Sequence, residues 1–140
     1  MKSKNTQRIA IFGTSADPPT IGHKKILEEL SKIFSYTISY ASNNPQKSHK
    51  EDISIRSLLL KTLIEDLNNP KIIFNQKISS QWAIESIKKC KSIYDHNYIN
   101  FVIGSDLIKE ISSWRNFDKM IKEVSFFIIE REGYPIESNT

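Results

Sequence analysis

Short apolar runs alternate along the chain with longer stretches in which apolar residues recur every three or four positions. The apolar runs are 8–13, 36–41, 71–75, 98–104 and 124–129. The helical patterns follow Thr20, cover 53–67 and 81–94, and form one or two short helices within 106–122. Unbroken apolar strands are typical of a parallel sheet with helices on both faces. The pattern therefore predicts a single doubly wound α/β domain with a five-stranded parallel sheet, in the order β-α-β-α-β-α-β-α-β.

Composition and charge narrow the class of protein. The 140 residues, 39% of them apolar, suit one globular domain spanning 1–140. A net charge of +4 fits an anionic ligand but also fits nucleic acid. Cys90 is the single cysteine, so an intramolecular disulfide or a cysteine metal cluster is excluded. The chain shows neither a signal peptide nor the roughly 20 apolar residues of a membrane span, so we expect a cytoplasmic protein without a membrane partner.

Polar or glycine-containing segments follow each of the predicted strands. They are 13–23, 43–49, 79–82, 104–106 with Trp114, and 131–134. In an open α/β sheet the carboxyl ends of the strands meet at one edge, and ligands bind in the crevice there. We therefore expect all five segments to face one crevice.

The first of these segments is the most informative. Gly13 and the short residues after it would let backbone N–H groups approach a ligand closely. A helix that begins after Thr20 offers free N–H groups and a partial positive charge, which suit a phosphate. His23 lies one turn further, so the two side chains can share a face. A capping threonine with an exposed histidine is the simpler alternative, but Gly22 costs about 1 kcal/mol relative to alanine in a helix and favours a ligand packed against the backbone.

Other well-known site patterns do not fit the chain. The Gly-x-x-x-x-Gly-Lys-Ser/Thr loop is absent, and so is the three-glycine dinucleotide fingerprint after the first strand. No Ser-His-Asp or Cys-His arrangement is indicated by spacing. Three histidines and one cysteine make a structural metal site a poor expectation.

The segment 20–23, Thr-Ile-Gly-His, resembles the His/Thr-x-Gly-His signature of the nucleotidylyltransferase superfamily. The longer string 13–23, Gly-Thr-Ser-Ala-Asp-Pro-Pro-Thr-Ile-Gly-His, resembles the first motif of bacterial nicotinate-nucleotide adenylyltransferases. Further similar segments are 44–49, 53–56, 104–106 with Trp114, and 131–134. The resemblance implies a Rossmann-like nucleotidylyltransferase fold. It also implies adenylyl transfer from ATP to nicotinate mononucleotide, which gives the deamido dinucleotide and pyrophosphate in NAD biosynthesis.

The resemblance also implies a role for each matching residue. The residues expected to act in catalysis are His23, Thr20 and Lys47. Those expected to bind ATP are Gly13, Thr14, Ser15, Gly22, His23, Gly104, Asp106 and Arg131. Those expected to bind the acceptor are Asp17, Lys47, Trp82, Ala83 and Trp114. Mg²⁺ is expected to arrive with ATP rather than at a protein metal site. The expected partners are ATP and a mononucleotide phosphate, and the oligomeric state stays open, a homo-oligomer included.

The chain departs from the family pattern in two places. Where the family has Ser-Tyr-Thr, this chain has Gln81, Trp82 and Ala83, so the threonine hydroxyl is lost. The family's Ile-Ser-Ser-Thr-x-x-Arg segment has no match before Thr140. Two alternatives therefore stay open: another adenylyl- or cytidylyltransferase of the superfamily, for example one acting on phosphopantetheine, and a catalytically impaired nucleotide-binding relative. A nucleic-acid-binding domain ranks last because no aromatic-basic motif is present.

Overall fold

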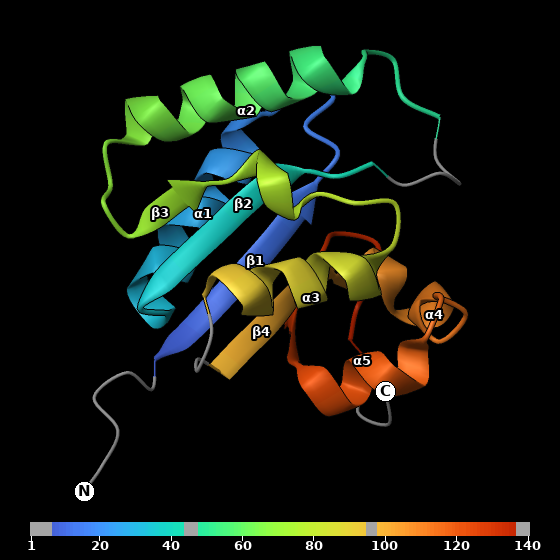
Figure 1. The fold of residues 1–140 in the computed structure, drawn as a ribbon. Coiled ribbons are helices and arrows are strands. Elements are labelled where there is room, and N and C mark those ends of the chain that lie inside the picture. Colours follow the sequence, from blue (N-terminus) through green and yellow to red (C-terminus); the bar gives the residue numbers. More distant parts are fainter. Residues whose placement is uncertain (1–6, 44–47, 95–97, 137–140) are drawn as a thin grey trace, which may run out of the picture.

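Five parallel strands form a single sheet in the order β3-β2-β1-β4-β5 (Figure 1). The computed structural model describes residues 7–43, 48–94 and 98–136. The strands are β1 (Arg8–Thr14), β2 (Tyr36–Ala41), β3 (Ile72–Phe74), β4 (Tyr98–Gly104) and β5 (Ser125–Ile129). The strand order reverses between β1 and β4, and such a switch point is where ligands bind in doubly wound folds. The predicted five-stranded parallel sheet is confirmed.

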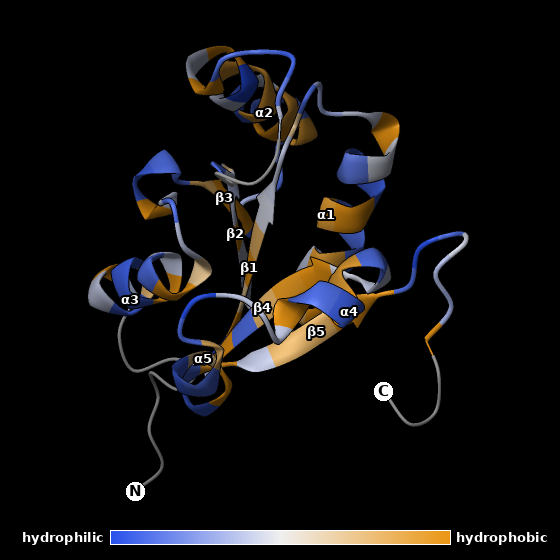
Figure 2. Cartoon of the chain, turned by 90° about the vertical axis from the view of Figure 1, so that its right-hand side faces the viewer, coloured by the Kyte–Doolittle hydropathy of each residue, from blue (hydrophilic) through white to orange (hydrophobic). Residues whose placement is uncertain are grey.

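Helices cover both faces of the sheet (Figure 1). They are α1 (Ile21–Ile33), α2 (Ile53–Leu67), α3 (Ala83–Ile93), α4 (Ile108–Ile111) and α5 (Phe117–Glu123), with two 3-10 turns, η1 (Gln76–Ile78) and η2 (Ser105–Leu107). Helices α1 and α2 pack on one face, while α3 and α5 pack on the other. Figure 2 shows apolar residues dominating β4 and β5 between these layers. Among the described residues, no helix is both long and apolar enough to cross a membrane.

The central strand β1 is buried on both sides. Ile9 and Ile11 belong to the apolar cluster under α3 and α5, and the alternate residues Ala10 and Phe12 belong to the cluster under α1 and α2. Successive side chains of a strand point to opposite faces, so a strand covered on both faces must be apolar at every position. This explains the unbroken apolar run in the sequence.

The largest difference from the predicted elements lies between β3 and α3. The sequence predicts a helix from 81, but α3 begins at Ala83, and β3 keeps three residues before the 3-10 turn η1. The Gln76 side-chain amide accepts from the Ala41 N–H and donates to the Ala41 carbonyl, both at 2.8 Å. The Gln76 amide satisfies the backbone groups of Ala41 at the end of β2, which would otherwise need a partner in β3. Strand β3 can therefore end after three residues. The periodicity of apolar residues does not reveal where a side chain takes the place of a backbone partner.

Candidate active site

The beginning of α1 forms a reciprocal capping box between Thr20 and His23. The Thr20 hydroxyl accepts from the His23 N–H at 3.4 Å, and the Thr20 N–H donates to His23 Nδ1 at 2.8 Å. Because a backbone N–H can only donate, Nδ1 must act as an acceptor, and the proton of the neutral ring then resides on Nε2. The cap therefore fixes both the orientation and the tautomer of His23 and leaves Nε2–H as a donor.

The surroundings of His23 favour this neutral ring. Partial burial lowers the pKa of His23 below 6.5, and the positive charge of Arg131 lowers it further. Both causes disfavour the imidazolium, because burial removes water and Arg131 repels a second positive charge. The start of α1 and the segment after β5, which are 108 positions apart in sequence (131 minus 23), both follow strands whose carboxyl ends lie at one edge of the parallel sheet. Two of the predicted site segments are thus brought together.

The two glycines of the segment 13–23 differ in what surrounds them. A Cβ at Gly22 would meet one atom within 4 Å, the Thr20 hydroxyl oxygen at 3.4 Å, so space remains beside the helix start. A Cβ at Gly13 would lie 2.7 Å from the Tyr40 ring, so that position is already filled. Gly22 therefore keeps the open space that the sequence indicated. Gly13 is required by the packing of Tyr40.

The loops that follow β1 and β2 are tied together by two charged side chains. The Asp17 carboxylate accepts from the N–H groups of Lys50 at 2.6 Å and Glu51 at 3.2 Å. Arg56 of α2 is 2% exposed and donates to the carbonyls of Ser15, Ser42 and Glu51, each at 2.9 Å. Both oxygens of Asp17 accept hydrogen bonds from the second loop, and its predicted contact with the acceptor stays a prediction. The buried role of Arg56 gave no sequence signal beyond its place at a helix start.

At the far side of the sheet edge, the ends of β4 and β5 bring Asp106 and Arg131 together. Arg131 Nη1 lies 3.6 Å from Asp106 Oδ2, and a Cβ at Gly104 would lie 2.7 Å from Arg131 Cδ, so the glycine makes room for the pair. Asp106 Oδ1 is buried and accepts no hydrogen bond from the described residues. An ionised carboxylate oxygen without a donor is costly unless a ligand supplies one.

Two half-buried tryptophans lie on the α3 side of the sheet. The Arg115 guanidinium lies 4.3 Å from the centroid of the Trp82 ring, and Trp114 packs edge-on against Phe101 with centroids 6.2 Å apart. Ala83 is the first residue of α3, directly after Trp82. Each tryptophan packs partly against the apolar core. The predicted role of both rings in binding the acceptor stays a prediction.

The remaining predicted site residues take the following places. Thr14 is buried at the end of β1, and its hydroxyl accepts from the Ala16 N–H at 3.4 Å. Ser15 follows in the loop after β1, and its carbonyl accepts a hydrogen bond from Arg56. Lys47 lies outside the described residues, so its predicted role stays a prediction. No group of three His, Cys, Asp or Glu side chains in the described part of the chain is arranged to hold a metal ion.

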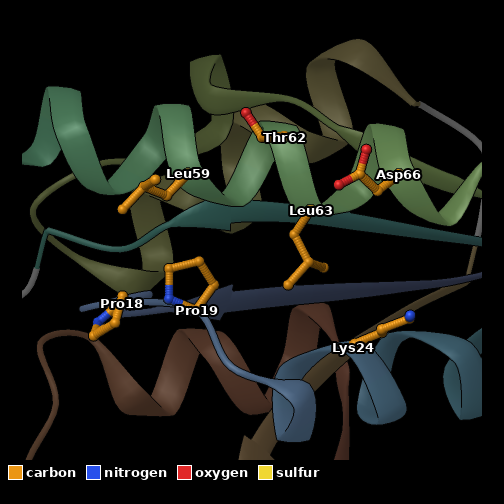
Figure 3. A pocket seen from close by; sticks show the side chains of 7 residues that line it. All are labelled: Pro18, Pro19, Lys24, Leu59, Thr62, Leu63 and Asp66. Carbon is orange, nitrogen blue, oxygen red and sulfur yellow. The ribbon is translucent and has the colours of Figure 1, made fainter.

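Two hollows of the surface lie away from the predicted site residues. A groove of about 350 Å³ separates Pro18, Pro19 and Lys24 from α2, which lines it with Leu59, Thr62, Leu63 and Asp66 (Figure 3). A second hollow of about 310 Å³ is lined by Ile84, Lys88, Lys119, Lys122 and Glu123. None of the predicted site residues lines either hollow.

Comparison with known proteins agrees with this arrangement. A profile of the cytidylyltransferase-like family matches residues 11–139. A probable nicotinate-nucleotide adenylyltransferase from Synechocystis sp. is 31% identical to this chain. The alignment of 140 positions covers 92% of this chain and 70% of the relative. The structure of Plasmodium falciparum nicotinic acid mononucleotide adenylyltransferase complexed with NaAD matches with a TM-score of 0.80 and 26% identity, over 95% of this chain and 69% of that one. A putative nicotinate-nucleotide adenylyltransferase from Vibrio parahaemolyticus matches with a TM-score of 0.75 and 25% identity, over 96% of this chain and 83% of that one.

Proposed function

We propose that this chain, which belongs to the nicotinate-nucleotide adenylyltransferase family of cytidylyltransferase-like proteins, transfers the adenylyl group of ATP to nicotinate mononucleotide. A phosphate oxygen of the mononucleotide forms a bond to the α-phosphorus of ATP, and the bond from this phosphorus to the β-phosphate oxygen breaks. The products are the deamido dinucleotide and pyrophosphate. Because the acceptor supplies the attacking oxygen, the protein contributes positioning and charge stabilisation rather than a nucleophile.

The observation that carries the proposal is the fixed donor of His23 at the start of α1. The Thr20 N–H holds Nδ1 at 2.8 Å, so Nε2–H is oriented before any ligand binds. The start of a helix adds free N–H groups and a partial positive charge to this donor. Negative charge grows on the leaving pyrophosphate during transfer, and preorganised donors stabilise such charge without having to reorganise.

The other ATP contacts follow from groups that the fold leaves available. The space beside Gly22 admits a phosphate, and Arg131 supplies a positive charge close to His23. The buried Asp106 Oδ1 accepts a hydrogen bond from a ribose hydroxyl of ATP. Gly104 makes room for Asp106 and Arg131 to lie together. The segment 13–15, where β1 ends, forms the floor between the two nucleotides.

The acceptor binds on the side of the two tryptophans. Trp82 and Trp114 offer aromatic surface for the pyridine ring, and the first N–H groups of α3, from Ala83 onward, face the carboxylate end of a nicotinate. Lys47 contacts the acceptor phosphate. Asp17 acts indirectly, because its carboxylate holds the loop that leads to α2.

Mg²⁺ enters with ATP as part of the substrate. Oxygen ligands of the phosphates and water suit this ion, which keeps several waters in most nucleotide sites. It neutralises charge on the phosphates when bound. Residues of the chain then orient the triphosphate through donors and Arg131 rather than through a carboxylate cage.

The test measures pyrophosphate release with ATP, Mg²⁺ and each of three acceptors: nicotinate mononucleotide, nicotinamide mononucleotide and phosphopantetheine. We expect the first to be the best substrate by kcat/KM. Faster release with phosphopantetheine, or with CTP in place of ATP, would identify a different transferase of the superfamily. Heat of ATP binding by calorimetry without any turnover would identify the catalytically impaired relative instead.

A further inference from the structure

Ser105 lies between two residues of the candidate site and contacts neither ATP nor the acceptor in the proposed arrangement. Its side chain is buried, with 6% exposure, at the point where β4 passes into the 3-10 turn η2. The hydroxyl accepts from the Arg131 N–H at 2.8 Å and donates to the Tyr134 carbonyl at 2.6 Å. Each of its hydrogen-bonding roles is thus filled by the segment that follows β5, 26 and 29 positions away in sequence.

The segment that Ser105 holds is a tight turn with few other contacts. Tyr134 N–H donates to the Arg131 carbonyl at 2.9 Å, and Gly133 between them has a φ of +85°, which favours glycine. Residues 131–134 are all exposed. Because little apolar surface is buried here, hydrogen bonds from outside the turn decide where it lies. Ser105 supplies two of them.

The position of this turn determines where the Arg131 guanidinium can reach. The side chain begins at the backbone that Ser105 holds, passes Gly104, and ends 3.6 Å from Asp106. The positive charge of Arg131 also contributes, after burial, to lowering the pKa of His23. Without the hydroxyl, the turn would lose its connection to β4, and the long, exposed side chain would spread over many rotamers.

We propose that Ser105 is a positioning residue that holds the backbone of Arg131, so that this arginine is presented to the polyphosphate beside Asp106. The proposal rests on the proposed function, because it assumes that ATP binds at this edge. It predicts that Ser105 affects the reaction through Arg131 and through no other group. A serine that served stability alone would affect the reaction independently of Arg131.

The first experiment is a double-mutant cycle on kcat/KM for ATP with Ser105→Ala, Arg131→Gln and the double variant. We expect Ser105→Ala to lower kcat/KM about three- to tenfold, mainly through KM, since one or two hydrogen bonds are lost. In the Arg131→Gln background the same substitution should change kcat/KM by less than about twofold. Equal effects of Ser105→Ala in both backgrounds would overturn the proposal.

Ser31→Ala is the matched control. Ser31 is also 6% exposed, and its hydroxyl also donates to a carbonyl, that of Glu28 at 2.7 Å, and accepts from an amide, Asn69 Nδ2 at 3.1 Å. It lies near the opposite end of α1 from His23. Its loss should lower the melting temperature about as much as Ser105→Ala and leave kcat/KM for ATP unchanged. Ser105→Cys, with weaker hydrogen bonds at similar volume, should give a smaller loss in the same direction.

A second measurement does not depend on turnover. NMR titration of the His23 ring in the free protein should show a higher pKa in Ser105→Ala than in the wild type, because Arg131 is then less often near the ring. Arg131 is the charged side chain that acts on this ring among the described residues. An unchanged His23 pKa would contradict the proposal even if adenylyl transfer fails. Absence of turnover with a raised pKa would contradict the proposed function alone.

Discussion

The two sides of the candidate site differ in how completely their charged side chains are paired. On the β1–β2 side, formed by residues 13–23, 42–43 and 48–56, the charged side chains of Asp17 and Arg56 are paired with backbone groups. Arg56 donates to three carbonyls, and Asp17 accepts from two N–H groups. On the β4–β5 side, formed by residues 104–106 and 131–134, the charged groups are left incompletely paired. The Asp106–Arg131 contact is 3.6 Å long, and Asp106 Oδ1 has no donor among the described residues.

This difference separates structural charges from binding charges. A buried guanidinium that donates to three carbonyls cannot turn toward a ligand without leaving those carbonyls unsatisfied. An unpaired carboxylate oxygen, by contrast, gains from a ligand donor. Loss of a charge on the β1–β2 side should therefore reduce stability, and loss of one on the β4–β5 side should reduce binding. His23 combines both behaviours, because its Nδ1 accepts from the Thr20 N–H while its Nε2–H is left to donate to a ligand.

The largest effect is expected for His23→Ala. Removal of one preorganised donor to developing charge costs about 10²–10³ in rate, so kcat should fall by this factor. KM for nicotinate mononucleotide should change much less, because the donor acts mainly in the transition state. Steady-state kinetics on pyrophosphate release measures both. Unchanged turnover would remove His23 from the mechanism.

Arg56→Met should produce the largest loss of stability, about 2–4 kcal/mol in the free energy of unfolding. The carbonyls of Ser15, Ser42 and Glu51 would then lack a donor in a partly buried place. Arg8→Met is the matched control, since exposed Arg8 lies 4.9 Å from the Phe34 ring centroid and its loss should cost less than about 1 kcal/mol. Urea unfolding measures both variants. Similar values for the two would mean that the β1–β2 side is not held by Arg56.

Asp106→Asn tests the β4–β5 side. The amide keeps one oxygen but loses the charge that attracts Arg131, so KM for ATP should rise about three- to tenfold. The free energy of unfolding should stay within about 1 kcal/mol, because the ion pair is long and the arginine is exposed. A stability loss as large as that of Arg56→Met would contradict the division between the two sides.

Sequence patterns predicted which residues lie at the edge of the sheet, but not the contacts between the two loops of the β1–β2 side. Parallel strands bring Gly13, His23, Gly104, Asp106 and Arg131 to the same edge of the sheet, and apolar periodicity is enough to find those strands. Asp17 belongs to the same motif, but its side chain turned out to hold a neighbouring loop. Which polar side chain meets a backbone group 33 positions away depends on loop geometry, and spacing does not encode that.

The β4–β5 side likewise contains contacts that the sequence did not predict. Ser105 stands between two motif residues, and the sequence analysis assigned it no role. Its partners lie beyond β5, and a single serine hydroxyl has no periodic signature. The Arg115–Trp82 contact likewise joins two segments that are adjacent in space alone. Sequence patterns identified the elements and the edge, while contacts across that edge required coordinates.

The smallest effect concerns pH, and it sharpens the description of His23. Its folded-state pKa is lowered, first by burial and then by Arg131, so the unfolded chain binds its proton more readily than the folded one. The stability contributed by the neutral ring is therefore complete above the unfolded pKa of about 6.5 and is lost as pH falls through the folded pKa. The difference in free energy of unfolding between the wild type and His23→Gln should shrink between about pH 7.5 and pH 5. Because the other ionisable groups are common to both proteins, a difference that grows as pH falls would mean that the folded protein prefers the imidazolium.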